Sequence, residues 1–183
     1  MRAFFLAAGA AVFFAAFPAS AGVMTIGGSF AEGCYKYADA RVATLDAVAT
    51  CDRAFSEQAL SFEDEFATYV NRGIVKMHRG EYTGALADFG RAGAMNPKRS
   101  EPWLNIGVLQ FRQGDSRAAI SSFDKALALG TDVPAVAYYG RGLAHEDMGD
   151  LKAAYADLRK AVELRPRWSD PARDLARYQV RHR

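Results

Sequence analysis

The chain has 183 residues, of which half are apolar and 24% are charged, a composition that is ordinary for a soluble protein with one substantial core. Its formal net charge of +2 is too small to indicate nucleic-acid binding, so nucleic acid is not expected among its partners. The arrangement of apolar residues along the chain is therefore the main source of information.

The first 21 residues have the pattern of a signal peptide. Arg2 precedes an apolar stretch over 3–17, Pro18 ends that stretch, and small residues stand at Ala19 and Ala21. A membrane span needs about 20 apolar residues, so we expect cleavage after Ala21 and a periplasmic or secreted protein. An uncleaved N-terminal anchor is the alternative. No later segment is apolar and long enough to cross a bilayer, so no membrane span is expected in the mature chain.

Two cysteines, Cys34 and Cys51, follow the expected cleavage site. An even number of cysteines in an oxidising compartment favours one disulfide bond. No other Cys or His lies near them to complete a metal site. Two reduced, buried thiols are the alternative.

Three units of 34 or 35 residues repeat after residue 65. In each unit, apolar residues at three- and four-residue spacing predict one helix, a glycine marks a turn, and the same spacing predicts a second helix. Pro97 and Pro166 follow the first and third units, since proline cannot continue a helix. Five columns keep one register: Gly73, Gly107, Gly142; Gly80, Gly114, Gly149; Ala85, Ala119, Ala154; Phe89, Phe123, Leu158; Ala92, Ala126, Ala161.

These units resemble tetratricopeptide repeats (TPRs), the 34-residue helix–turn–helix family. The match rests on the five columns and on a large aromatic residue before each first glycine. These aromatic residues are Tyr69, Trp103 and Tyr138. The departures from the family pattern are Arg72 and Arg141 for Leu, Leu158 for an aromatic residue, and Thr131 for Pro. The resemblance implies an all-α fold, an α-solenoid of stacked antiparallel helix pairs that binds other proteins.

The register divides the chain into a signal peptide (1–21), a degenerate N-terminal helix pair (22–61), three repeats (62–99, 100–134 and 135–168) and a capping helix (169–183). In the degenerate pair, Ala47, Cys51 and Ala54 follow the spacing of a second helix, while Cys34 falls on the preceding first helix. We therefore expect a Cys34–Cys51 disulfide to join the two helices of this hairpin. After the last repeat, Trp168 is expected to cover the end of the stack.

Catalytic motifs are missing from the sequence. It contains no His-Glu-x-x-His, no Gly-x-Ser-x-Gly and no phosphate-binding loop. His78, His145 and His182 are scattered, and a solvent-facing side chain is the ordinary role for the first two, which lie near the ends of first helices. Residues 22–61 offer no nucleophile–base pair for a hydrolase. We therefore expect no enzymatic activity, no cofactor and no metal.

The partner site is predicted on the first helices of the repeats, which the resemblance places along the concave side of the stack. Counting by register there gives an apolar groove with two amides that can bond a peptide backbone. Its residues are Val70, Asn71, Ile74, Met77, Leu104, Asn105, Val108, Phe111, Tyr139 and Leu143. Packing against neighbouring helices is the alternative role for these side chains.

The expected partner is another protein, which contributes an apolar peptide or helix. Family members that bind chaperone tails hold a carboxylate in this groove, but Val70 and Ile74 occupy the positions of the first such pair. A glycan or an anionic lipid is the alternative ligand. The C-terminal stretch 159–183 has eight basic residues against three acids, although a solvated cap explains such a stretch as well.

Overall fold

Nine α-helices follow one another in the computed structural model, which describes residues 29–178, and no strand occurs in that range. The predicted signal peptide lies outside the described residues. The helices are α1 (Ser29–Asp39), α2 (Leu45–Glu57), α3 (Phe62–Arg79), α4 (Tyr82–Met95), α5 (Glu101–Arg112), α6 (Ser116–Ala128), α7 (Pro134–Asp147), α8 (Leu151–Leu164) and α9 (Ser169–Leu175), the last extended by a short 3-10 helix (Ala176–Tyr178). The all-α prediction is confirmed.

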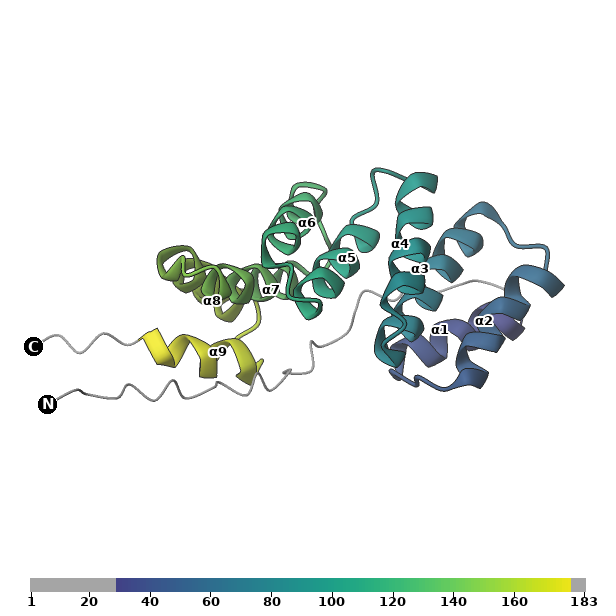
Figure 1. Cartoon of the computed structure of the whole chain (residues 1–183), viewed down its shortest axis with the longest axis horizontal. Helices are drawn as coiled ribbons and strands as arrows, with labels where there is room; N and C mark the ends of the chain where they lie inside the picture. The colour runs from purple at the N-terminus through teal and green to yellow at the C-terminus, as the bar shows by residue number, and fades with distance from the viewer. Residues whose placement is uncertain (1–28, 179–183) are drawn as a thin grey trace, which may run out of the picture.

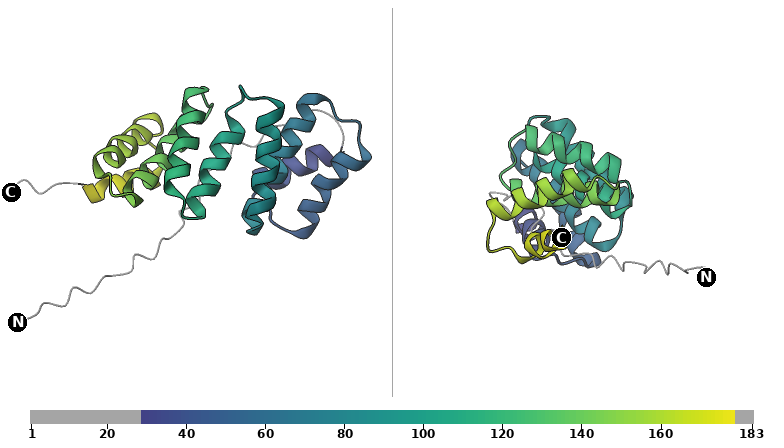
Figure 2. Two further views of the ribbon diagram at one scale, coloured as in Figure 1. Left: turned by 45° about the horizontal axis from the view of Figure 1, so that its top comes forward. Right: turned by 90° about the vertical axis from the view of Figure 1, so that its left-hand side faces the viewer.

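The helices form antiparallel pairs that stack along the longest axis of the molecule, as Figure 1 shows. The pairs are α1–α2, α3–α4, α5–α6 and α7–α8, and α9 packs against α8 at the far end. Successive first helices also contact one another, α1 with α3, α3 with α5 and α5 with α7. We call the side that these four helices form the first-helix face. Figure 2 shows the same row of pairs from two other directions. The predicted α-solenoid is therefore confirmed.

Glycine makes the turn inside each repeat. Gly80, Gly114 and Gly149 have φ angles of 82°, 82° and 81°, a left-handed conformation that side chains disfavour. The following helices α6 and α8 start at aspartates: Asp115 accepts a hydrogen bond from the N–H of Ala118, and Asp150 is bonded in the same way. In the second and third repeats the turn therefore both ends one helix and caps the next, whereas Glu81 before α4 makes no side-chain cap.

Small residues let the paired helices approach closely. A Cβ atom on Gly73 would lie 2.5 Å from the ring of Phe89, which belongs to the second helix of the same repeat. Phe123 has two such neighbours, because a Cβ on Gly107 would lie 2.8 Å and one on Gly140 2.5 Å from its ring. Gly140 belongs to the next repeat, so the ring of Phe123 packs between successive repeats.

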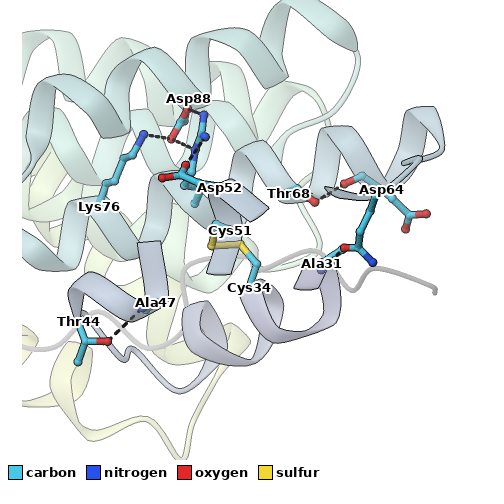
Figure 3. Close-up of a disulfide and its surroundings, with 12 residues drawn as sticks. Ala31, Cys34, Thr44, Ala47, Cys51, Asp52, Asp64, Thr68, Lys76 and Asp88 are labelled. Atoms are coloured by element: carbon cyan, nitrogen blue, oxygen red, sulfur yellow. Dashed lines mark hydrogen bonds and ion pairs between the residues drawn. A yellow bond between two sulfur atoms is a disulfide. The ribbon is translucent and has the colours of Figure 1, made fainter. Parts of the chain in front are cut away.

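The predicted disulfide joins α1 to α2 (Figure 3). The Sγ atoms of Cys34 and Cys51 are 2.07 Å apart, and both side chains are fully buried. The hairpin is also held by a hydrogen bond from the N–H of Ala31 to the side chain of Gln58, at 2.9 Å. Closing a loop of this size stabilises a fold by about 3 kcal/mol in the chain-entropy model. Within residues 29–178 this helix pair has a neighbouring pair on one side only, so a covalent link matters most there.

An arginine connects the first repeat to the helix pair before it. Arg72 of α3 donates two hydrogen bonds to Asp88 of α4, at 2.9 and 2.6 Å, and a third to Asp52 of α2, at 2.6 Å. Lys76 adds a second ion pair to Asp88 at 2.8 Å. Figure 3 shows the side chain of Lys76 pointing toward Asp88. The side chain of Asp88 is only 5% exposed, so these charge-assisted bonds compensate a buried carboxylate.

The third repeat contains the same arrangement. Arg141 of α7 donates two hydrogen bonds of 2.8 Å to Asp157 of α8 and another to Asp124 of α6, the preceding second helix. The bonds to Asp157 raise the pKa of Arg141. We call each of these three-residue sets, Arg72–Asp88–Asp52 and Arg141–Asp157–Asp124, an arginine clamp. The corresponding positions around the middle repeat are occupied by Ile106, Ser122 and Gly90. The junction between the first and second repeats therefore has no clamp.

Candidate partner-binding surface

Most of the predicted groove is buried within the stack. The exposed fraction is 0% for Val70, Asn71, Ile74, Leu104, Asn105 and Tyr139, and 2% for Met77 and Val108. Phe111 and Leu143 are partly buried and pack against the core. Packing is therefore at least one role of these side chains, and their role in binding a partner stays a prediction. Phe111 and Leu143 are the two members of the predicted groove that keep part of their surface exposed.

Asn105 shows why a buried amide matters on this face. Its Nδ2 donates a hydrogen bond to the carbonyl of Glu101 at 3.0 Å, one turn earlier in α5. Its Oδ1 is buried and has no hydrogen-bond partner in the part of the chain that the structure describes. A buried acceptor of this kind costs free energy until an N–H group reaches it.

The C-terminal segment closes one end of the first-helix face. The hydroxyl of Tyr139 donates a hydrogen bond of 2.7 Å to Asp174 of α9, and the ring of Trp168 meets that of Tyr139 edge-on, with centroids 4.8 Å apart. Burial, strengthened by Asp174, raises the pKa of Tyr139. Tyr139, which the register placed in the groove, thus anchors the cap.

Three basic side chains from different segments lie near one another toward the other end of this face. His78 is in the last turn of α3, Arg112 ends α5, and Arg41 lies in the loop between α1 and α2. Burial, together with the charges of Arg112 and Arg41, lowers the pKa of His78 to about 4. The expectation of an ordinary solvent-facing histidine is wrong here, because His78 is half-buried and neutral at pH 7.

Arg112 is also unusual in its surroundings. Its Nε atom is buried without a hydrogen-bond partner, and burial lowers the pKa of its guanidinium. No ion pair joins Arg112, Arg41 or His78 to a carboxylate within residues 29–178. Sequence reasoning missed this cluster, since its three members lie on segments that only the fold brings together.

The repeated helix pairs match a known family. Two family models described as "Tetratricopeptide repeat" match residues 70–134 and residues 135–167. The chain is a TPR protein. The resemblance drawn from the glycine, alanine and aromatic columns is therefore confirmed, and it covers more than half of the sequence.

Several solved structures share the TPR stack. A MamA chain (41-end) from Desulfovibrio magneticus RS-1 is 20% identical with a TM-score of 0.64, over 84% of each chain. TTC0263, a thermophilic TPR protein of Thermus thermophilus, is 18% identical with a TM-score of 0.62, over 81% of this chain and 78% of that chain. The first TPR of Spaghetti (RPAP3), bound to an HSP90 peptide, is 22% identical with a TM-score of 0.59, over 62% of this chain and 89% of that chain. At these identities the likeness shows the fold alone.

A curated relative matches part of the chain in sequence. Protein FlbA of Caulobacter vibrioides is 34% identical over 67 residues, which make up 37% of this chain. The match covers only 11% of FlbA, so the chain spans about a tenth of that relative's length. The similarity therefore does not extend to the activity of FlbA as a whole.

Two kinds of feature are missing from the described part of this TPR protein. None of the helices between residues 29 and 178 combines the length and the apolar character that crossing a membrane requires. The same range contains no cluster of three His, Cys, Asp or Glu side chains placed to hold a metal ion. The remaining candidates for a partner-binding surface are the first-helix face and the cluster of Arg41, His78 and Arg112.

Proposed function

We propose that this TPR protein is a non-catalytic module of the bacterial envelope that binds an apolar peptide or helix of a partner protein on its first-helix face. The observation that carries the proposal is the row of first helices, where Phe111 of α5 and Leu143 of α7 keep part of their surface exposed beside the buried core. TPR stacks serve in general as protein-interaction modules, and the first TPR of Spaghetti (RPAP3) holds a peptide.

Export to the envelope is supported by two features of different kinds. The sequence of residues 1–21 has the pattern of a cleaved signal peptide, and Cys34 and Cys51 form a disulfide. Structural disulfides persist in oxidising compartments and are rare in the reducing cytosol. Together, the two features support a periplasmic or secreted location.

A glycan or an anionic lipid has less support as the ligand. The basic C-terminal stretch that suggested such a ligand is partly paired with nearby acids. Within the described part of that stretch, Arg173 contacts Asp170 and Asp174, Arg177 contacts Glu146, and Lys160 contacts Glu163. These pairs lower the local positive charge of the described part of the stretch, which weakens the support for an anionic ligand there.

The test is a crosslinking pull-down from the native envelope with the mature protein and a Phe111→Glu, Leu143→Glu variant. Both substitutions place a charge on partly exposed first-helix positions, so the fold is expected to survive. Circular dichroism must show that the variant keeps its helical content. We expect the wild-type protein to capture a partner that this variant does not capture.

The matched control is Leu86→Glu, Leu151→Glu, which places the same two charges on exposed positions of second helices. Leu86 is 41% exposed and Leu151 is 57% exposed. We expect the control variant to capture the same partner as the wild-type protein. Loss of the partner in both variants, or in neither, would contradict binding on the first-helix face.

A further inference from the structure

Most partly buried arginines of this protein are paired with carboxylates. Arg72 and Arg141 sit in the arginine clamps, and Arg99 contacts Glu63 and Glu101. Arg41, His78 and Arg112 are different, because all three are partly buried and none has a carboxylate partner between residues 29 and 178. Unpaired charge in a partly desolvated place is costly, and it is typical of a site that an outside anion completes.

The fold holds these three side chains together from three segments. Helices α3 and α5 pack side by side, and His78 and Arg112 have the same register position in successive repeats, 34 residues apart. The loop containing Arg41 is fixed against the end of α3 by a hydrogen bond of 3.1 Å from Arg79 to the carbonyl of Ala43. Arg41 itself has a positive φ of 55°, which is uncommon outside glycine and sets the course of the loop.

The remaining charged neighbours do not neutralise the cluster. On α3, Lys76 is paired with Asp88 and Arg79 is paired with Glu81. Tyr82 of α4 is close enough to Arg112 to favour its charged form, but its hydroxyl is not a carboxylate partner. The groups around His78 that carry an uncompensated charge are therefore Arg41 and Arg112.

We propose that Arg41, His78 and Arg112 form a binding site for a carboxylate group of an acidic peptide, at the edge of the first-helix face beside Phe111. This inference rests on the proposed function and adds the chemistry of the partner: a carboxylate next to an apolar residue. The site lies beyond the groove positions Val70 and Ile74, since His78 is two helical turns after Val70 and one turn after Ile74, about 12 Å and about 6 Å along α3.

The charge of the site fits one carboxylate better than a phosphate. Two guanidinium groups contribute two positive charges, and His78 is neutral at pH 7. The C-terminal ends of α3 and α5 each contribute roughly half a negative charge, which leaves about one positive charge. One carboxylate balances this charge and can accept two hydrogen bonds from the fork of Arg112. The acid would also favour protonation of His78, so binding couples to proton uptake in mildly acidic solution.

His78 is a built-in reporter for the experiment. We would follow the imidazole resonances of the full mature chain by NMR at pH 5.5, while sodium acetate replaces sodium chloride at constant ionic strength. Occupation of the site is expected to give a saturable change at His78 and to raise its pKa by at least one unit, with His145 unchanged. The change is expected to need at least tenfold more acetate in Arg112→Gln and to be partly kept in Arg112→Lys.

Arg117→Gln is the matched control, since Arg117 is an exposed arginine of the neighbouring helix α6, and it should bind acetate as the wild type does. Should Arg112→Gln fail to fold, Arg41→Gln replaces it, with the same tenfold weakening expected. Identical His78 spectra in acetate and chloride would overturn the inference. Saturation by inorganic phosphate without any response to acetate would overturn the assignment to a carboxylate.

The outcomes also separate this inference from the proposed function. If acetate binds but capture of the partner does not depend on Phe111 and Leu143, the anion site stands and the proposed function fails. If capture depends on those two residues while acetate has no effect on His78, the proposed function stands and this inference fails.

Discussion

Two junctions of the stack differ, although the repeats on either side share one register. One junction joins the second and third repeats, and the other joins the first and second. At the former, Arg141 bonds acids in both repeats, and the ring of Phe123 packs against Gly140 of the next repeat. At the latter, the clamp positions hold Gly90, Ile106 and Ser122, and the position of Gly140 is taken by Asn105. The same register therefore carries an arginine clamp at one junction and uncharged residues in the clamp positions at the other.

The three clamp positions change together for an electrostatic reason. Asp157 is 6% exposed and would be a buried, uncompensated charge without Arg141. Asp88, which is 4% exposed, would keep only Lys76 as a partner without Arg72. A repeat that lacks the arginine must lack the buried acid as well, and the middle repeat has Ser122 there. The middle junction instead has an ionic contact at its other end, where Arg99 reaches Glu63 of α3.

The largest effect on stability is expected when the arginine of one clamp is removed and its buried aspartate is left in place. Arg141→Ile should lower the free energy of unfolding by about 3 kcal/mol, because it leaves the buried carboxylate of Asp157 unpaired. Adding Asp157→Ser reproduces the middle repeat and should restore most of the loss. Urea denaturation at pH 7 measures both variants. Equal losses in the single and double variants would mean that the buried charge is not the cause.

Adding a methyl group should have opposite effects at Gly140, which packs against a ring, and at Gly90, which has no close neighbour. Gly140→Ala should cost about 2 kcal/mol, because the new Cβ would overlap the ring of Phe123. Gly90→Ala has nothing within 4 Å of its Cβ and removes a glycine from the interior of α4, so it should gain about 0.5–1 kcal/mol. Thermal unfolding of the two variants compares them directly. Two shifts of the same sign would contradict this difference between the junctions.

Acid is expected to weaken the middle junction through His78, which lies on α3 beside α5. The folded protein takes up this proton only at about pH 4, whereas the unfolded chain takes it up at about pH 6.5. Stability is therefore complete above pH 6.5 and is lost as the pH falls toward 4, by about 1 kcal/mol for a partly exposed group. Urea denaturation in chloride at pH 7 and pH 4.5 should show a smaller loss for His78→Gln, and His145→Gln should behave as the wild type.

The smallest effect is expected at the exposed acid of a clamp. Asp124 is more than half exposed, so Asp124→Ala should cost less than about 1 kcal/mol although it removes a contact between repeats. Comparison with Arg141→Ile in the same urea series shows which bond of the clamp matters. A loss as large as that of Arg141→Ile would assign the stability to the contact between repeats.

The sequence predicted the stack and the disulfide because both depend on the register. A column of glycines or alanines is visible without coordinates, and the same count places Cys34 and Cys51 on the two helices of one hairpin. The clamps were recognisable only in part. Arg72 and Arg141 stood out as departures from the family pattern, and each is followed 16 residues later by the aspartate that it binds, a signal that the column analysis did not use.

The exposure of the groove could not be predicted in the same way. Register assigns Val70 or Leu104 to a side of a helix, but the area left open there depends on how closely neighbouring elements pack. The cluster of Arg41, His78 and Arg112 was missed for a related reason. Its members come from a loop and two helices far apart in sequence, and only the packing of α3 against α5 brings them together.

The disulfide between α1 and α2 also makes the two ends of the protein differ in their resistance to a pulling force. When the chain is pulled from its two ends, the C-terminal cap is held by non-covalent contacts such as Tyr139 with Asp174, so it should extend first. The cross-linked hairpin cannot release the 17-residue separation between its cysteines, which hides roughly 55 Å of contour length. In a force-extension experiment, that length should appear only after a reducing agent is added.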